Sequence, residues 1–168
     1  VLDPVMISKS GFPLLQPDAQ EALVEYLLPL ATIVTPNIPE AEAITGKAIK
    51  NLQDMKEAAR IISSFGSLKV LVKGGHMENQ AIDILFDGQG FYEFEAPRFN
   101  TKNTHGTGCT LSASIASNLA KGMESAKAIE ASKKYITTAI EHSLAIGKGV
   151  GPTHHFYDLY KKAGLTDE

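Results

Sequence analysis

The stretch NTHGTGCTLSASIASNLAKG, residues 103–122, changes from loop to helix character within a few positions. Gly106 and Gly108 flank a threonine, and two glycines this close together allow a tight backbone turn. Apolar residues then recur at four-residue spacing, which predicts a helix over residues 107–121 that stops at the next glycine. The only cysteine of the chain, Cys109, falls where the turn meets this helix.

Outward from this stretch, segments of strand and helix character alternate along the chain. Strands are predicted at residues 1–6, 31–35 and 68–73, and a hairpin at 81–86 and 90–95 around the turn DGQG. Helices are predicted from Pro17, from Pro39 to Gly46, from Asn51 to Gly66, from Glu124 to about Ile146, and over residues 153–162. This order predicts an α/β layered fold, with a mostly parallel central sheet flanked by helices and a β-hairpin near one edge.

Composition and charge narrow the functional classes. The 168 residues are 43% hydrophobic and 21% charged, which is typical of one globular domain with a core. The net charge of −3, without a Lys/Arg-rich run, argues against nucleic acid or an anionic membrane as partner. A single cysteine cannot form an internal disulfide, so a cytoplasmic location is expected.

Polar residues follow each of the first three predicted strands. Ligands of open α/β sheets collect at the carboxyl ends of strands, where this chain has Asp3, then TPNIPEAE with Asn37 and Glu40, then KGGH with Lys73. Glu40 suits either water-mediated magnesium binding or the capping of a helix. Lys73 either reaches a polyphosphate or is an ordinary strand-end lysine. Asp3 either holds a metal or accepts N–H groups of its loop.

The start of the helix after residue 106 is a candidate anion site, because its free N–H groups and helix dipole favour negative charge. The same position favours the thiolate of Cys109, which could accept a proton from an attacking hydroxyl. The alternative is a plain turn followed by a small buried cysteine. His105 either contacts a ligand or shapes the turn, whereas the adjacent His154 and His155 are interpreted as surface or packing residues.

The segments LDPVMISKSG, TPNIPEAEAITG, LVKGGH and NTHGTGCTLSASIASNLAKG together resemble the ribokinase-like family of ATP-dependent small-molecule kinases. The closest resemblance is to the hydroxymethylpyrimidine/phosphomethylpyrimidine kinases of thiamine biosynthesis. It implies Cys109 as catalytic base and an anion hole, meaning a set of backbone amides around the transferring phosphoryl group, made by Gly106, Thr107, Gly108 and Cys109. It also implies ATP binding by Asn37, Lys73, Thr107 and Gly108, and Mg²⁺ binding by Glu40 and Asp3.

The implied reaction is transfer of the ATP γ-phosphoryl group to an aminopyrimidine alcohol, 4-amino-5-hydroxymethyl-2-methylpyrimidine, and then to its monophosphate. Members of the family begin with strands that precede the residues present here, so we expect residues 1–168 to be the C-terminal, nucleotide-binding portion of a single domain. The resemblance also suggests a homodimer.

Three other functions compete with this interpretation. A pyridoxine/pyridoxal kinase and a hydroxyethylthiazole kinase share much of the glycine-rich segment. The third is a nucleotide-binding remnant without catalysis.

Overall fold

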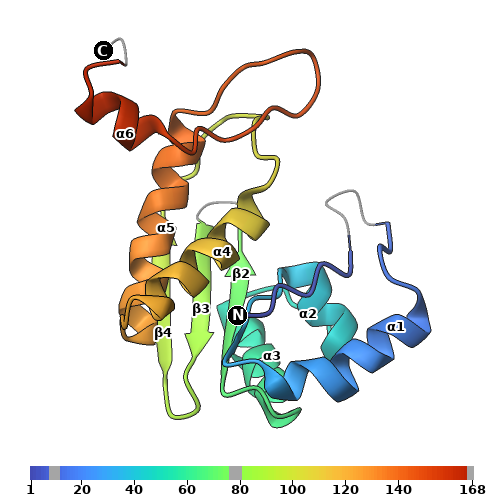
Figure 1. The fold of residues 1–168 in the computed structure, drawn as a ribbon. Coiled ribbons are helices and arrows are strands. Elements are labelled where there is room, and N and C mark those ends of the chain that lie inside the picture. The colour runs from blue at the N-terminus through green and yellow to red at the C-terminus, as the bar shows by residue number, and fades with distance from the viewer. Residues whose placement is uncertain (8–11, 76–80, 166–168) are drawn as a thin grey trace. The chain divides into compact units, whose positions relative to one another are not determined.

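The computed structural model describes residues 1–7, 12–75 and 81–165, and the chain separates into two compact units, Val1–Glu95 and Ala96–Glu168 (Figure 1). The first unit holds a sheet with the helices that precede and cover it, and the second holds three helices and their loops. The histidine of the KGGH motif, residue 76, lies outside the described residues.

The sheet of the first unit has four strands in the order β1-β2-β3-β4. They are β1 (Ile33–Val34), β2 (Lys69–Gly74), β3 (Ala81–Phe86) and β4 (Phe91–Ala96). β1 and β2 run parallel, β2 and β3 run antiparallel, and β3 turns directly into β4 at the edge. The hairpin at one edge is therefore confirmed. The sheet is mixed, because its parallel pairing is confined to β1, β2 and the isolated bridges Leu2–Val34 and Asn37–Lys73 beside them.

The predicted first strand is reduced to one bridge. Leu2 pairs in parallel with Val34. The Leu2 N–H donates to the Ile33 oxygen at 2.8 Å, and the Leu2 oxygen accepts the Thr35 N–H at 2.9 Å. Pro4 follows two residues later and has no N–H to continue the ladder. The short pairing still leaves Asp3 at the same edge as the carboxyl end of β1.

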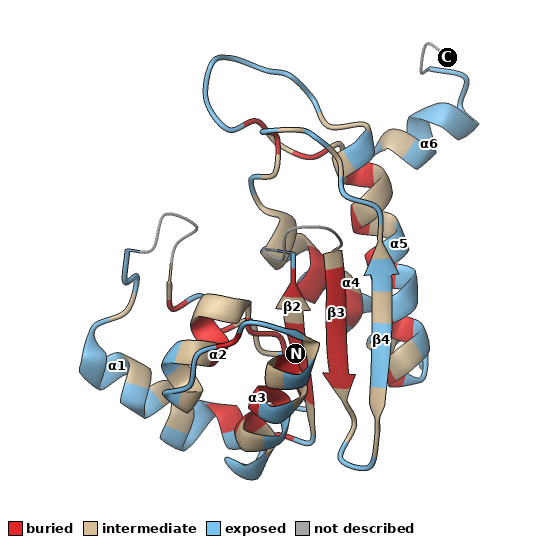
Figure 2. Ribbon diagram, turned by 180° about the vertical axis from the view of Figure 1, so that it is seen from behind, coloured by how far each residue is buried: buried red, intermediate tan, exposed pale blue. Residues whose placement is uncertain are grey.

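Helices α2 (Ile38–Thr45) and α3 (Leu52–Ser64) begin and end as the sequence predicts, within one or two residues. Asn51 caps α3 by accepting the Asp54 N–H at 3.0 Å. The apolar face of α3 packs against β2 and β3, and its buried residues are Met55, Ala58, Ala59 and Ile62. Figure 2 shows this face buried together with β2 and β3, while β4 is largely exposed. Complete burial of Met55 and Ile62 contributes about 3–6 kcal/mol to the hydrophobic free energy.

The helix predicted from Pro17 changes its winding along its length. α1 (Pro17–Ala22) continues as a π-helical turn over Leu23–Leu27 and a 3₁₀ turn over Leu28–Leu30. A 3.6-residue period from Pro17 predicts an apolar face of Ala22, Leu23, Tyr26 and Leu27, but Tyr26 and Leu27 are exposed and Leu28 is fully buried. The wider π turn rotates the residues after it, so a 3.6-residue period places them on the wrong face.

The second unit is built on α4 (Thr107–Ala120), α5 (Ser125–Glu141) and the short α6 (Tyr157–Lys162). α4 packs along α5, and the Asn118 amide donates to the Ser132 hydroxyl between them at 3.0 Å. The prediction that α5 reaches Ile146 is wrong, because the chain turns at His142 and the Leu144 N–H then donates to the Pro152 oxygen at 3.2 Å. α6 begins four residues later than predicted. Among the described helices, none combines the length and hydropathy that crossing a membrane requires.

Candidate active site

Four predicted site residues of the first unit gather at one edge of the sheet. Lys73, at the end of β2, forms a salt bridge of 2.8 Å from its Nζ to Asp3 Oδ1, and both side chains are only 14% exposed. Asn37 lies beside Lys73 in a parallel bridge, and the Lys73 N–H donates to the Pro36 oxygen at 2.8 Å. The carboxyl ends of three parallel segments therefore meet here, as the sequence predicts.

Thr35 lies next to the salt bridge of Asp3 and Lys73. It is fully buried, and its hydroxyl lies 3.3 Å from Asp3 Oδ1 and 3.4 Å from the Leu2 oxygen. Asp3 Oδ1 thus accepts hydrogen bonds from both the Lys73 ammonium and the Thr35 hydroxyl. Thr35 was not predicted as a site residue from the sequence, although its position at a strand end, directly before Pro36 and Asn37, pointed to it.

Glu40 and Asn37 form a complete capping box at the start of α2. Asn37 Oδ1 accepts the Glu40 N–H at 2.9 Å, and Glu40 Oε2 accepts the Asn37 N–H at 2.9 Å. Glu40 Oε1 also accepts the Met6 N–H at 3.1 Å, so both carboxylate oxygens bind backbone. The capping role that the sequence left open for Glu40 is therefore observed.

Burial of Glu40, which is 2% exposed, raises the pKa of its carboxyl above the ordinary value of 4.5. The backbone N–H of Asn37, the charge of Lys73 and the N–H of Met6 oppose this rise of the pKa, and the negative charge of Asp3 adds to it. Glu40 is thus a buried carboxylate held in place by two backbone donors, with the charge of Lys73 nearby.

The donor set fits magnesium bound through water and phosphate. Within the described part of the chain, no cluster of three or more His, Cys, Asp or Glu side chains could enclose a metal ion. Mg²⁺ keeps several waters and commonly takes only one or two carboxylates together with substrate phosphates. Asp3 and Glu40 supply two carboxylates to the same sheet edge, since Asp3 pairs with Lys73 and Glu40 binds the N–H of Asn37, which lies in a bridge with Lys73.

The glycine turn of the second unit has the predicted form. Gly106 adopts φ +80°, a left-handed conformation that glycine tolerates, and stands as N-cap of α4 without a side-chain cap. The Thr107 hydroxyl donates to the Thr104 oxygen at 2.6 Å, which closes the turn. Cys109 lies in the first turn of α4 and is exposed, so the alternative of a buried core cysteine is wrong. His105 shapes the turn through its backbone N–H, which donates to the Gly151 oxygen at 3.2 Å.

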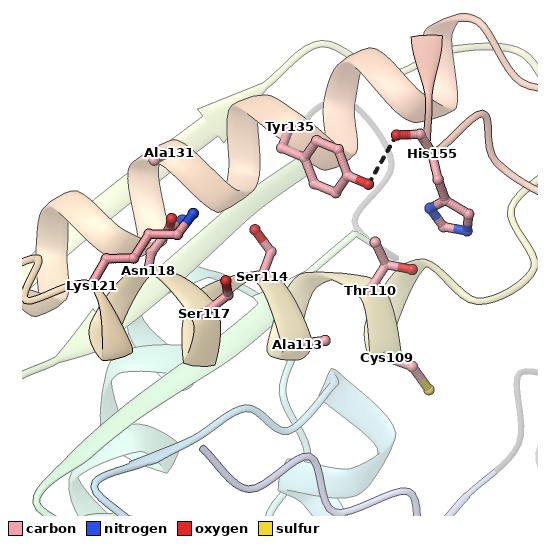
Figure 3. A pocket seen from close by; sticks show the side chains of 10 residues that line it. All are labelled: Cys109, Thr110, Ala113, Ser114, Ser117, Asn118, Lys121, Ala131, Tyr135 and His155. Atoms are coloured by element: carbon pink, nitrogen blue, oxygen red, sulfur yellow. Dashed lines mark hydrogen bonds between the residues drawn. The ribbon is translucent and has the colours of Figure 1, made fainter. Parts of the chain in front are cut away.

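A groove of about 670 Å³ runs between α4 and α5 from Cys109 to Lys121 (Figure 3). Small polar side chains of α4 line one wall, and Tyr135 of α5 closes the other by donating its hydroxyl to the His155 oxygen at 3.1 Å. This groove was not predicted from the sequence. The signal for it was the run of Ser and Ala residues on the side of α4 opposite its apolar stripe.

Solved structures of small-molecule kinases share this fold. A pyridoxal kinase of Bacillus subtilis in an ADP complex matches 92% of this chain and 59% of its own, with 42% identity and a TM-score of 0.85. A phosphomethylpyrimidine kinase of Clostridium difficile matches 82% of this chain and 55% of its own, with 50% identity and a TM-score of 0.72. The chain thus has a ribokinase-like α/β fold.

Sequence relatives narrow this class to one family. The family model described as Phosphomethylpyrimidine kinase matches residues 1–154, and the chain belongs to that family. A hydroxymethylpyrimidine/phosphomethylpyrimidine kinase of Staphylococcus aureus is 48% identical over the full chain. A bifunctional thiamine biosynthesis protein of Geobacter sulfurreducens is 49% identical over 92% of it. The chain spans 62% of the length of the Staphylococcus aureus relative.

Proposed function

We propose that this chain is the nucleotide-binding part of an ATP-dependent kinase that phosphorylates 4-amino-5-hydroxymethyl-2-methylpyrimidine and its monophosphate in thiamine biosynthesis. The observation that carries the proposal is the family match over residues 1–154, which includes every candidate site residue from Asp3 to Cys109. The strand-end cluster of Asp3, Asn37, Glu40 and Lys73 supports it independently, since these four side chains gather as a phosphate and magnesium site requires.

In the first unit, Lys73 neutralises charge on the ATP phosphates. Asp3 holds the Lys73 ammonium in one place before ATP binds, so its Nζ has less freedom to lose. The capping box fixes Asn37 and Glu40 at the start of α2. Mg²⁺, when bound, neutralises developing charge on the phosphates, and Asp3 and Glu40 would hold it through water.

In the second unit, the amides of Gly106, Thr107, Gly108 and Cys109 act as the anion hole, and Thr107 and Gly108 also bind ATP. The Cys109 thiolate accepts the proton of the substrate hydroxymethyl group. The hydroxyl oxygen forms a bond to the γ-phosphorus while the bond from that phosphorus to the β,γ-bridging oxygen breaks, and ADP leaves. No covalent bond to sulfur forms, so Cys109 acts as a proton acceptor only.

Pyridoxal is the second candidate acceptor. The pyridoxal kinase structure of Bacillus subtilis has the higher TM-score, 0.85 against 0.72, although the phosphomethylpyrimidine kinase has the higher identity, 50% against 42%. Members of the two activities therefore share this part of the fold closely. The pyrimidine is preferred here because the relatives at 48–50% identity carry the name of the pyrimidine kinase.

The test is a coupled assay of ADP release by the complete gene product with ATP and Mg²⁺. The acceptors are hydroxymethylpyrimidine, its monophosphate, pyridoxal and hydroxyethylthiazole. Turnover of both pyrimidines is expected. Activity confined to pyridoxal or to the thiazole would overturn the substrate assignment, and no turnover with any acceptor would leave only a nucleotide-binding remnant. Light scattering of the same preparation tests the expected homodimer, and cell fractionation tests the cytoplasmic location.

A further inference from the structure

The loop that enters α4 is tied to a segment nearly fifty residues later in the chain. His105 pairs with Pro152 in a parallel bridge, and the His105 N–H donates to the Gly151 oxygen at 3.2 Å. This contact involves the residue directly before Gly106, whose left-handed conformation opens the turn. The conformation of the turn therefore depends on where Gly151 stands.

Asn103 fixes the position of Gly151 from the other side. Its side chain is buried, at 6% exposure, and its Oδ1 accepts the Gly151 N–H at 3.1 Å. The Asn103 N–H donates to the Thr101 hydroxyl at 3.1 Å, which orients the asparagine itself. Both backbone polar groups of Gly151 thus bind the loop 101–106, one through Asn103 and the other through His105.

Gly151 has no room for a side chain. A Cβ atom there would lie 2.4 Å from Asn103 Oδ1 and 2.7 Å from the Leu144 oxygen. Both distances are far below van der Waals contact, and the second involves backbone, which cannot rotate away. Asn103 and Gly151 are therefore fitted to each other.

We propose that Asn103 and Gly151 form a clamp that sets the glycine turn, and that Asn103 is a positioning residue for phosphoryl transfer. This inference rests on the proposed function, because it concerns the amides assigned there to the anion hole. The start of α4 has no side-chain cap, so tethers within the loop must hold Gly106 and the amides that follow it. A displacement of about 1 Å at such donors lowers the rate about 100-fold.

A positioning role of Asn103 predicts a result that a purely structural role of this residue does not. In Asn103→Ala, kcat falls about 100-fold while KM for the pyrimidine stays within threefold. Asn118→Ala is the matched control, because it removes an amide hydrogen bond between α4 and α5, away from the turn. It lowers the melting temperature by a comparable amount but leaves kcat within twofold.

A double-variant cycle adds a second criterion. Gly151→Ala acts on the same contact, so Asn103→Ala combined with Gly151→Ala lowers kcat much less than the product of the two single effects. Thr101→Val, which removes the acceptor of the Asn103 N–H, lowers kcat in the same direction and serves if Asn103→Ala does not fold.

Amide hydrogen exchange separates failure of the clamp from failure of the proposed function. In Asn103→Ala, the amide of His105, which donates to the Gly151 oxygen, exchanges at least tenfold faster than in the wild type, whereas Asn118→Ala leaves it unchanged. Unchanged exchange in Asn103→Ala, or an unchanged kcat in an active enzyme, overturns the clamp. A wild-type protein that is inactive toward every acceptor overturns the proposed function, and the exchange experiment then still decides whether the clamp exists.

Discussion

Gly74 and Gly75 follow Lys73 at the end of β2, and only the first of them lacks room for a side chain. A Cβ atom on Gly74 would lie 2.0 Å from the Ile82 oxygen and 2.9 Å from Met55 Cε, whereas no atom of the described residues lies within 4 Å of a Cβ on Gly75. The Gly74 N–H also donates to Asp83 Oδ1 at 2.9 Å. Gly74→Ala and Gly75→Ala are therefore a matched pair that differs in one local contact.

The expected magnitude follows from these distances. The new methyl group of Gly74→Ala must push β3 away from β2, and such overpacking costs about 1–3 kcal/mol. The movement also weakens the hydrogen bond to the Asp83 carboxylate, a kind of bond worth about 1.5–3 kcal/mol. Together these lower the free energy of unfolding by about 2.5–6 kcal/mol. Gly75→Ala changes it by less than about 0.5 kcal/mol, as open surface sites do.

Urea unfolding of the complete gene product, followed by circular dichroism at 222 nm, measures both variants under the same conditions. Gly74→Ala is expected to shift the midpoint strongly with an unchanged slope, and Gly75→Ala to superimpose on the wild type. If the two variants agree within about 0.5 kcal/mol, the close approach of Gly74 to Ile82 is refuted, and with it the strand end that carries Lys73.

Three further predictions concern single side chains. Lys73→Met lowers kcat/KM for ATP by about 10–100-fold, because one charge-assisted contact to the phosphates is lost. A steady-state kcat/KM within twofold of the wild type would show that Lys73 does not contact the phosphates. Because folding raises the pKa of Glu40, the folded state binds more protons than the unfolded state between pH 4.5 and the raised pKa. The free energy of unfolding of the wild type therefore falls relative to that of Glu40→Gln as the pH rises from 4.5 through the raised pKa. Urea unfolding at several pH values measures this difference, and parallel pH profiles of the two proteins would contradict it. Thr153 Oγ1 is buried without a hydrogen-bond partner among the described residues, so Thr153→Val raises the free energy of unfolding by about 1 kcal/mol. A decrease of the free energy of unfolding by the same amount, measured by thermal or urea unfolding, would show that the hydroxyl has a partner.

Signals within a few residues of sequence were sufficient to predict much of the secondary structure of the first unit. Asn37 and Glu40 three residues apart predicted the start of α2, and Asn51 with Asp54 predicted α3, because caps act within one turn. DGQG predicted the β3–β4 hairpin. The gathering of Asp3, Asn37, Glu40 and Lys73 followed from one rule, that the carboxyl ends of parallel segments meet at one edge.

Features that depend on distant residues were not predictable. The π turn at Leu23–Leu27 breaks the 3.6-residue period on which the predicted face of α1 depended. The end of α5 at Glu141 is set by the pairing of Leu144 with Pro152, which no local stop residue signals. The contact of Asn103 with Gly151 joins residues 48 positions apart, so neither residue shows its partner in the sequence.

Cys109→Ala in the complete gene product tests whether Cys109 accepts the substrate proton at the start of α4. ATP binding by calorimetry is measured beside single-turnover phosphorylation of hydroxymethylpyrimidine. The variant is expected to bind ATP within threefold of the wild type and to transfer the phosphoryl group about 10²–10⁴ times more slowly, the contribution of a general base. A single-turnover rate equal to that of the wild type would exclude Cys109 as the proton acceptor.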